Sequence, residues 1–269
     1  MNIEPIRPVL RRILSKKIYG VGAAALDFAA VIATEGLSTW QQLRECSRAT
    51  INSRPIDIQL KKLSHPLTIR PGTAAASTVV SNIIRKEYGF IKPTLEPFWM
   101  VDAGAYIGDT SAYFLSQFPN LRVIALEPNP INYVAMLQNL SPYGDRAILL
   151  NKGLFSQDKG LRFSGSGTAG TVGDIGGSSV ECVSIPSILE TYSVSNLDIL
   201  KMDIEGVEDE IFSSDPGKWL PLVGMIIVEI HSPEKLVVIR KILGQYHFTM
   251  TRYRSVWYCL NSANGNLSY

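Results

Sequence analysis

Short apolar runs alternate with segments of helical periodicity from residue 98 almost to the end of the chain. The runs predict buried strands, and the segments between them, with apolar residues three or four positions apart, predict helices. The predicted strands are 98–101, 121–126, 147–155, 197–202 and 222–230, followed by an antiparallel pair at 247–254 and 256–260. The predicted helices include 75–88, 131–140, 186–192 and 233–244. Such alternation favours a parallel sheet with right-handed crossovers. We therefore expect an α/β fold of the Rossmann-like, doubly wound type, with a mostly parallel seven-stranded sheet.

Residues 1–66 differ from the rest because they show helical periodicity without strand-like runs between the helical segments. Breakers at Gly36, Pro55 and Pro66 separate the helical pieces. We predict that 1–66 form a helical cap, which packs on the main domain or on a second copy of the chain, and that 67–269 form the main α/β domain. Homo-oligomerisation through these helices is one expectation.

The composition is that of a soluble globular protein. Of the 269 residues 46% are hydrophobic and 19% charged, and the net charge of +2 does not favour nucleic acid as a partner. Three scattered cysteines indicate neither a disulfide framework nor a zinc site, so we expect a reducing, cytoplasmic location. The apolar stretch 21–33 is about thirteen residues long, too short to span a bilayer. A packed helix is favoured over a signal peptide. The alternative is peripheral contact with anionic lipid, because a basic segment with Arg7, Arg11, Arg12, Lys16 and Lys17 precedes the apolar stretch.

The first predicted strand runs into a glycine turn, Asp102-Ala-Gly-Ala-Tyr-Ile-Gly108, after which helical spacing begins. In doubly wound sheets, ligands bind beyond the carboxyl ends of the strands. The spacing Asp-x-Gly-x-x-x-Gly is not the Gly-x-Gly-x-x-Gly of dinucleotide sites. Asp102 would repel a diphosphate but suits a cationic ligand such as S-adenosylmethionine, which carries a sulfonium and an ammonium group. Gly104 has no Cβ, and we expect it to let the backbone approach that ligand closely.

The second predicted strand ends in Glu127-Pro128-Asn129. Glu127 lies about twenty residues past the glycine turn, where a carboxylate is expected to bind ribose hydroxyls. Pro128 stiffens the chain beyond it, and Asn129 is suited to cap the next helix. The predicted cofactor-binding residues are Asp102, Gly104, Ala105, Tyr106, Gly108, Glu127, Pro128 and Asp203.

Charged residues also follow two later strands. Lys201, Asp203 and Glu205 alternate at the end of one strand, and Glu229 and His231 alternate at the end of the next. Alternating residues of a strand share one face, so the two strand ends should present carboxylates and an imidazole together. Like charges packed in this way need a cation, a metal or a proton to compensate them.

These groups suggest two kinds of chemistry. His231 is the best candidate for a general base because imidazole titrates near neutrality, and Asp203 would orient it or act as the base itself. Glu205 completes the predicted catalytic set. The alternative is that Asp203, Glu229 and His231 ligate Mg²⁺ or Mn²⁺, because hard oxygen ligands favour such ions. We place metal-free chemistry ahead of it.

A glycine- and serine-rich stretch at 164–179 interrupts the core pattern. It has few apolar residues to bury, so we expect either an active-site lid or a mobile hairpin tip.

Three stretches together resemble the FkbM family of S-adenosylmethionine-dependent methyltransferases, which are class I enzymes. They are Val101-Asp-Ala-Gly-Ala-Tyr-Ile-Gly-Asp-Thr-Ser, Ala125-Leu-Glu-Pro-Asn-Pro and Ile199-Leu-Lys-Met-Asp-Ile-Glu-Gly-Val-Glu. The likeness covers roughly 69–231, and its most specific part is Lys-x-Asp-x-Glu-Gly-x-Glu. After Thr73 the family often has an Asp where this chain has Ala74, Ala75 and Ala76.

The resemblance implies O-methylation of a hydroxyl, commonly on a sugar or polyketide; the predicted acceptor is therefore a small molecule, glycolipid or polysaccharide. Carried onto this chain, it places Asp102, Gly104 and Glu127 against the cofactor, and Asp203, Glu205, Glu229 and His231 against the acceptor. Two rivals stay open at this stage. One is a nicotinamide-dependent oxidoreductase, which the glycine spacing and Asp102 disfavour. The other is a non-catalytic cofactor-binding scaffold of a biosynthetic complex.

Overall fold

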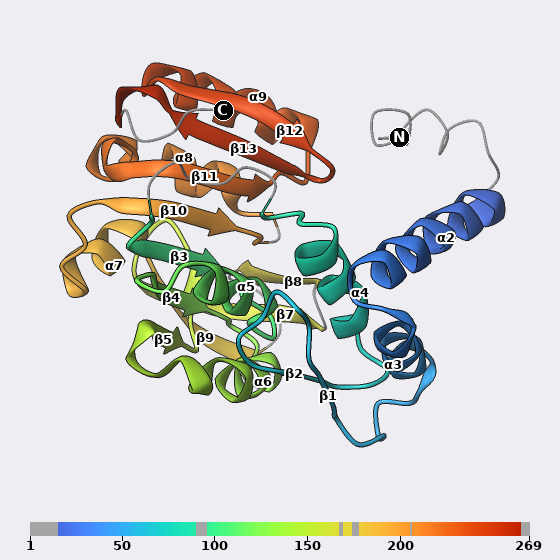
Figure 1. Ribbon diagram of the computed structural model, residues 1–269. Helices are drawn as coiled ribbons and strands as arrows, with labels where there is room; N and C mark the ends of the chain where they lie inside the picture. Colours follow the sequence, from blue (N-terminus) through green and yellow to red (C-terminus); the bar gives the residue numbers. More distant parts are fainter. Residues whose placement is uncertain (1–15, 90–95, 167–168, 174–177, 205, 265–269) are drawn as a thin grey trace.

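The computed structural model describes residues 16–89, 96–166, 169–173, 178–204 and 206–264, and its centre is a seven-stranded sheet (Figure 1). The strand order is β12-β13-β11-β10-β3-β4-β5, and β13 alone runs opposite to the other six strands. The strands are β3 (Trp99–Ala103), β4 (Arg122–Leu126), β5 (Ala147–Leu150), β10 (Leu197–Met202), β11 (Val223–Glu229), β12 (Phe248–Tyr253) and β13 (Val256–Asn261). This confirms the predicted α/β, doubly wound class.

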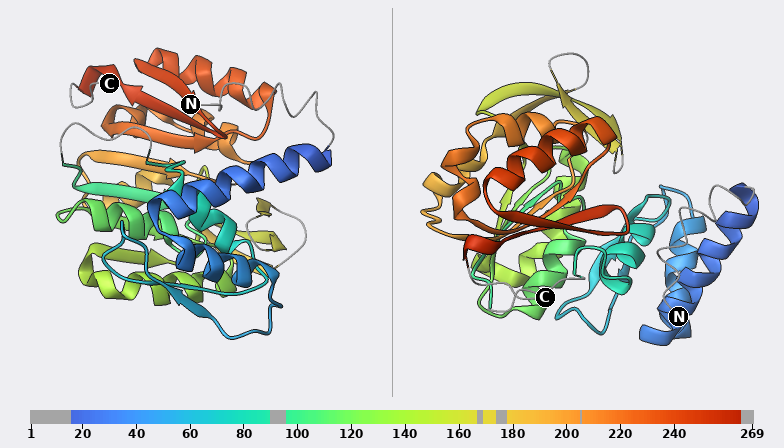
Figure 2. Two further views of the ribbon diagram at one scale, coloured as in Figure 1. Left: turned by 45° about the vertical axis from the view of Figure 1, so that its right-hand side comes forward. Right: turned by 90° about the horizontal axis from the view of Figure 1, so that it is seen from above.

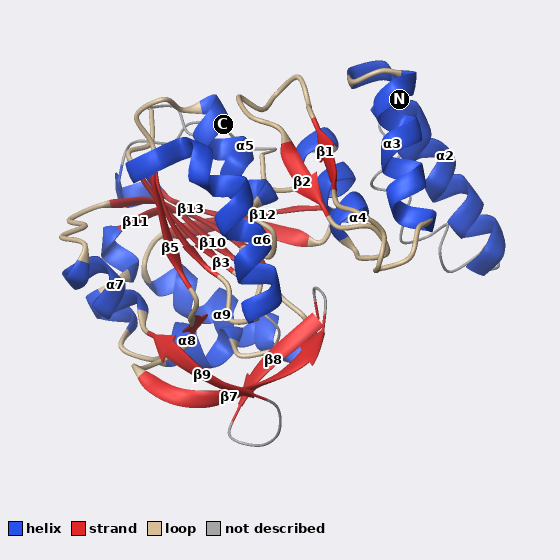
Figure 3. Ribbon diagram, turned by 90° about the horizontal axis from the view of Figure 1, so that it is seen from below, coloured by secondary structure: helices blue, strands red, loops and turns tan. Residues whose placement is uncertain are grey.

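Helices cover both faces of the sheet, and each face has its own apolar core (Figure 3). The helices α5 (Asp109–Gln117) and α6 (Pro130–Leu140) pack on one face against residues such as Met100 and Val123. The other face is covered by α7 (Ile185–Thr191), α8 (Glu208–Ser213) and α9 (Pro233–Gln245). Because successive strand residues point to opposite faces, Val101 and Ile124 belong to this second core. Continuous apolar strands of this kind are the pattern of a sheet buried on both sides.

The N-terminal helices lie beside the sheet rather than over it (Figure 2). The first two are α2 (Lys16–Thr34) and α3 (Leu37–Arg48), and they reach the main domain through α4 (Ala75–Val79) and the π-helix η2 (Val80–Ile84). The predicted helix 75–88 therefore ends earlier than expected. Lys86 has a positive φ of 55°, which breaks the helical path and turns the chain toward Tyr88.

The expected helical cap also contains a strand. A short antiparallel hairpin pairs β1 (Ile56–Ile58) with β2 (Leu67–Ile69), so backbone hydrogen bonds cross the predicted boundary between residues 66 and 67. Asn139 of α6 receives a hydrogen bond from the Thr68 backbone N–H at 2.8 Å, which ties the hairpin to the sheet domain. The predicted division into 1–66 and 67–269 stays a prediction.

The expected strand 147–155 is two strands in different sheets. After β5 ends at Leu150, β6 (Gly153–Leu154) joins a second sheet with β7 (Lys159–Ser166), β8 (Ala169–Gly173) and β9 (Ser178–Val183). The glycine- and serine-rich stretch thus supplies paired strands, because strand pairing uses backbone groups and needs no large side chains. Residues 167–168 and 174–177 lie outside the described part, and a role as a lid stays a prediction.

Two further expectations concern location. The three cysteines, Cys46, Cys182 and Cys259, are buried and free. Among the helices that the described residues form, none combines the length and apolar character needed to cross a membrane.

Candidate active site

The glycine turn at the carboxyl end of β3 is shaped by close approach of the chain to itself. A Cβ on Gly104, whose φ is 77°, would lie 1.9 Å from the backbone oxygen of Asp203. A Cβ on Gly108, whose φ is 80°, would lie 2.8 Å from Cγ of Leu140 in α6. We expected Gly104 to make room for a ligand; in the structure it makes room for the end of β10. It thereby brings Asp203 against the turn, so the two charged regions predicted from the sequence adjoin.

Asp102 lies beneath this turn and is fully buried. Its Oδ1 is 3.0 Å from Lys201 Nζ, and its Oδ2 accepts a hydrogen bond from Ser111 Oγ at 2.6 Å. Lys201 in turn donates to the Gly104 backbone oxygen at 2.7 Å. Burial alone would lower the pKa of Lys201, but Asp102 and Asp203 outweigh it and leave that pKa raised. Asp102 therefore holds the lysine that braces the turn, and direct contact between Asp102 and a cofactor stays a prediction.

Glu127 connects the ends of β3 and β4. Its Oε2 accepts from the Tyr106 backbone N–H and its Oε1 from the Asn129 N–H, both at 2.9 Å, and Asn132 Nδ2 lies 3.3 Å from Oε1. Since an ionised carboxylate has about four acceptor positions, room is left for one further donor, such as a ribose hydroxyl. The backbone N–H groups of Gly104 and Ala105 both donate to Leu126 O, so they are engaged within the protein. Pro128 is half-buried directly after Glu127.

Acidic groups dominate the charge at this edge of the sheet. Burial raises the pKa of Glu127 to about 7 and that of Asp109 to about 6, even though Asn82 Nδ2 donates to Asp109 Oδ2 at 2.9 Å. Desolvated acids of this kind are stabilised in their ionised form by a neighbouring cation, whereas a diphosphate would add to the repulsion. These carboxylates therefore fit a positively charged cofactor.

The second charged region lies at the ends of β10 and β11, which are parallel neighbours. Candidate ligand atoms of Asp203, Glu229 and His231 all lie within 4.8 Å of one another, as predicted from the strand alternation. Glu205, the remaining predicted member, lies outside the described residues. The three residues line a cavity of about 390 Å³, here called the polar cavity. Its other lining residues are Ser77, Thr78, Ser81, Asn82, Glu87, Tyr88 and Ser255.

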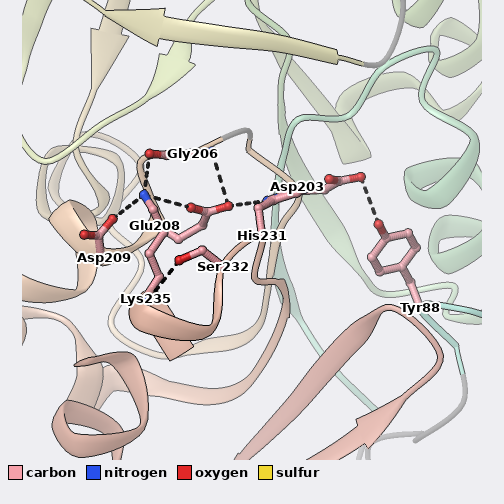
Figure 4. Close-up of polar contacts among 8 residues, drawn as sticks. All are labelled: Tyr88, Asp203, Gly206, Glu208, Asp209, His231, Ser232 and Lys235. Carbon is pink, nitrogen blue, oxygen red and sulfur yellow. Dashed lines mark hydrogen bonds and ion pairs between the residues drawn. The ribbon is translucent and has the colours of Figure 1, made fainter. Parts of the chain in front are cut away.

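His231 is oriented by a carboxylate that the sequence analysis did not assign. Its Nδ1 lies 2.5 Å from Oε1 of Glu208, the first residue of α8, whose side chain is fully buried (Figure 4). The Gly206 N–H donates to the same oxygen, and Lys235 Nζ lies 3.6 Å from Oε2. Burial alone would raise the pKa of Glu208, but the hydrogen bond to His231 and the other contacts leave it lowered. In the neutral imidazole, an Nδ1 that faces a carboxylate carries the proton, and the lone pair is then on Nε2.

Asp203 has a partner that the sequence did not indicate. Its Oδ2 accepts a hydrogen bond from the Tyr88 hydroxyl at 2.9 Å (Figure 4), and its predicted role in orienting His231 stays a prediction. Burial and the charges of Asp203 and Glu229 raise the pKa of Tyr88 well above its ordinary value, so the phenol keeps its proton. Burial together with Asp203 raises the pKa of Glu229 to about 7. At neutral pH the cavity therefore holds proton donors as well as acceptors.

Four of these groups had no role assigned from the sequence. Tyr88 and Glu87 come from the segment after η2, which carries no motif, and Ser255 comes from the β12–β13 turn. Glu208 is the last residue of Lys-x-Asp-x-Glu-Gly-x-Glu, so the signal was present without a role attached. The spacing of Asp203, Glu229 and His231 would also suit a metal ion, because the bond from Tyr88 uses only Oδ2 of Asp203 and the contact with Glu208 uses only Nδ1 of His231, so a metal set stays a prediction.

Comparisons with known proteins all indicate a methyltransferase family. The family model described as the methyltransferase FkbM domain matches residues 102–250, more than half of the chain. The methyltransferase sdnD of Sordaria araneosa is 26% identical over 237 residues, covering 68% of this chain and 88% of that protein. The hexuronic acid methyltransferase AglP of Haloferax volcanii is 30% identical over 148 residues, covering 54% of this chain and 60% of that protein.

Solved structures show a more distant likeness. The crystal structure of the methyltransferase FkbM from Methylobacillus flagellatus is 17% identical, with a TM-score of 0.45. The match covers 86% of this chain and 60% of that one.

Proposed function

The chain belongs to the FkbM family of methyltransferases, and from this premise we propose that it transfers a methyl group from S-adenosylmethionine to a hydroxyl of a small molecule or saccharide. The observation that carries the proposal is the His231–Glu208 pair at the polar cavity, next to the acid-lined turn after β3. A hydroxyl is a poor nucleophile at neutral pH, and an oriented imidazole is the group it needs. The name of the haloarchaeal relative, which refers to a hexuronic acid, supports a sugar-type acceptor.

The cofactor residues are assigned as follows. Glu127, with one acceptor position left, binds a ribose hydroxyl, while the turn at Gly104, Ala105, Tyr106 and Gly108 forms the wall beside it. Asp203 adjoins this turn and contributes negative charge near the sulfonium. When bound, S-adenosylmethionine supplies a methyl group on a positively charged sulfur, which leaves with the electron pair of the broken C–S bond.

His231 moves the proton. Its Nε2 takes the proton of the acceptor hydroxyl as the oxygen forms its bond to the methyl carbon, and the buried Glu208 carboxylate stabilises the imidazolium that results. Tyr88 donates a hydrogen bond to Asp203 and so fixes the orientation of that carboxylate beside the imidazole. The walls of the polar cavity hold the hydroxyl in line with the methyl group, and such positioning supplies much of the rate in methyl transfer.

The test separates proton chemistry from cofactor binding. Labelled S-adenosylmethionine is incubated with a panel of neutral sugars and glycosides, while calorimetry measures the affinity for S-adenosylmethionine. His231→Ala should lower turnover by about 10²- to 10⁴-fold with little change in that affinity. The matched control is His65→Ala, because His65 meets the ring of Tyr143 edge to face and does not line the polar cavity. Wild-type turnover in both His231→Ala and Asp203→Ala would refute the assignment. Tight cofactor binding without transfer to any hydroxyl would favour the scaffold instead.

A further inference from the structure

A second cavity lies on the other side of the α4–η2 helix from the polar cavity. It has a volume of about 590 Å³ and is here called the apolar cavity. Its apolar lining comes from α2, α3 and α4–η2, namely Phe28, Trp40, Leu43, Ala76 and Val80. An ion pair of 2.8 Å between Asp27, which lines this cavity, and Arg85 joins α2 to the residue after η2.

The two cavities share a ridge. Ser77 and Ser81 line both of them, and residues four apart in a helix lie one above the other on the same face. Their neighbours divide accordingly, with Thr78 and Asn82 on the polar side and Ala76 and Val80 on the apolar side. A helix is only about 10 Å across including its side chains. One molecule of modest length can therefore reach both cavities by crossing the two small serine side chains.

The linings differ sharply in chemistry. Every residue lining the polar cavity carries a hydroxyl, amide, carboxylate or imidazole group, and none is Lys or Arg. In the apolar cavity the rings of Phe28 and Trp40 meet edge to face with centroids 5.1 Å apart, and Phe28 remains 42% exposed. Arg44 and Arg48 also line it, and the aliphatic part of an arginine side chain covers apolar surface while its charge faces water. An exposed aromatic wall beside a hydroxyl-binding site is suited to the apolar part of the same ligand.

We propose that the acceptor is an amphiphilic conjugate, such as an alkyl or aryl glycoside. Its hydroxylated part occupies the polar cavity, and its apolar part crosses the Ser77–Ser81 ridge into the apolar cavity. This inference rests on the proposed function and adds a substrate class to it. It also assigns a role in acceptor binding to the N-terminal helices, because α2 and α3 supply Phe28, Trp40 and Leu43 to the apolar cavity.

The test compares each free neutral hexose with its octyl glycoside, used below the micelle concentration, as acceptors in the labelled-methyl assay. Each octyl glycoside should show a kcat/KM higher than that of the free hexose by roughly tenfold or more, mainly through a lower KM. The reason is that the octyl group buries several methylene groups in the apolar cavity. Phe28→Ser should remove most of this advantage and leave transfer to the free sugar unchanged. Phe28 is partly exposed, so the variant should fold. The matched control is Leu37→Ser, since Leu37 is 55% exposed on α3 and lines neither cavity.

Three outcomes are distinguishable. An octyl advantage that Phe28→Ser loses and Leu37→Ser keeps supports the inference. Equal kcat/KM for free and octyl sugars, or an advantage that Phe28→Ser retains, overturns the inference and leaves the proposed function standing. Transfer to no hydroxyl of either series, while S-adenosylmethionine still binds, overturns the proposed function and the inference with it.

Discussion

Replacing Glu208 by Gln tests whether the contact between Glu208 and His231 contributes to catalysis. The substitution keeps the shape of the side chain and removes the charge that faces His231 Nδ1 at 2.5 Å. With charge centres roughly 4 Å apart and an effective dielectric constant of about 20, an imidazolium–carboxylate pair is worth about 4 kcal/mol. Lys235 Nζ, 3.6 Å from the other oxygen, already offsets part of that attraction. Taking about 2.7 kcal/mol as the loss, kcat should fall about 100-fold.

The assay is methyl transfer across a pH series, with calorimetric affinity for S-adenosylmethionine and the melting temperature measured on the same samples. Because the imidazolium loses its partner, the acid limb of the pH–rate profile should move to lower pH, which a merely structural defect would not cause. Asp209→Asn is the matched control. Asp209 lies next in α8 and pairs with the same Lys235 at 2.6 Å. An equal loss in Asp209→Asn, or an unchanged kcat in Glu208→Gln, would refute the positioning role.

Three further predictions follow from the same geometry. Gly104→Ala should lower the free energy of unfolding in urea by about 3 kcal/mol, because its Cβ would meet Asp203 O at 1.9 Å. The control, Gly144→Ala, has a φ of 58° and a ψ of −139°, a conformation nearly restricted to glycine, and no atom lies within 4 Å of its Cβ position, so its cost should be backbone strain alone, about 2 kcal/mol; a loss at Gly104 no larger than at Gly144 would contradict the close approach. The pKa of Asp109 is raised from 3.8 to about 6, so its folded carboxyl keeps a proton that the unfolded one has lost. Its contribution to stability is therefore present at low pH and is lost as pH rises through about 6. Relative to Asp109→Asn, the wild type should lose up to about 3 kcal/mol between ~pH 4 and ~pH 7, and a flat difference in denaturation would count against the shift. Finally, treatment with EDTA should leave turnover within about twofold if proton chemistry at His231 carries the reaction. A loss restored by Mg²⁺ or Mn²⁺ would instead favour the set Asp203, Glu229 and His231 as metal ligands.

The sequence determined the central sheet and the position of the site within it. Strands that are apolar along their whole length, such as 223–228, require burial on both faces, and their alternation with amphipathic helices leads to a parallel sheet. Strand periodicity then placed Asp203, Glu229 and His231 together, because parallel strands end at the same edge. These are local properties of spacing, so one sequence is enough to state them.

Tertiary structure alone decided which groups touch. Glu208 and His231 are separated by 23 residues, and only the packing of α8 beside β11 makes one orient the other. Tyr88 reaches Asp203 across 115 residues, after a π-helix whose end no residue pattern marked. The apolar cavity beside the Ser77–Ser81 ridge depends on how α2 and α3 pack against α4–η2. Contacts of this kind arise from the shapes of several elements packed at once, and spacing along the chain does not encode them.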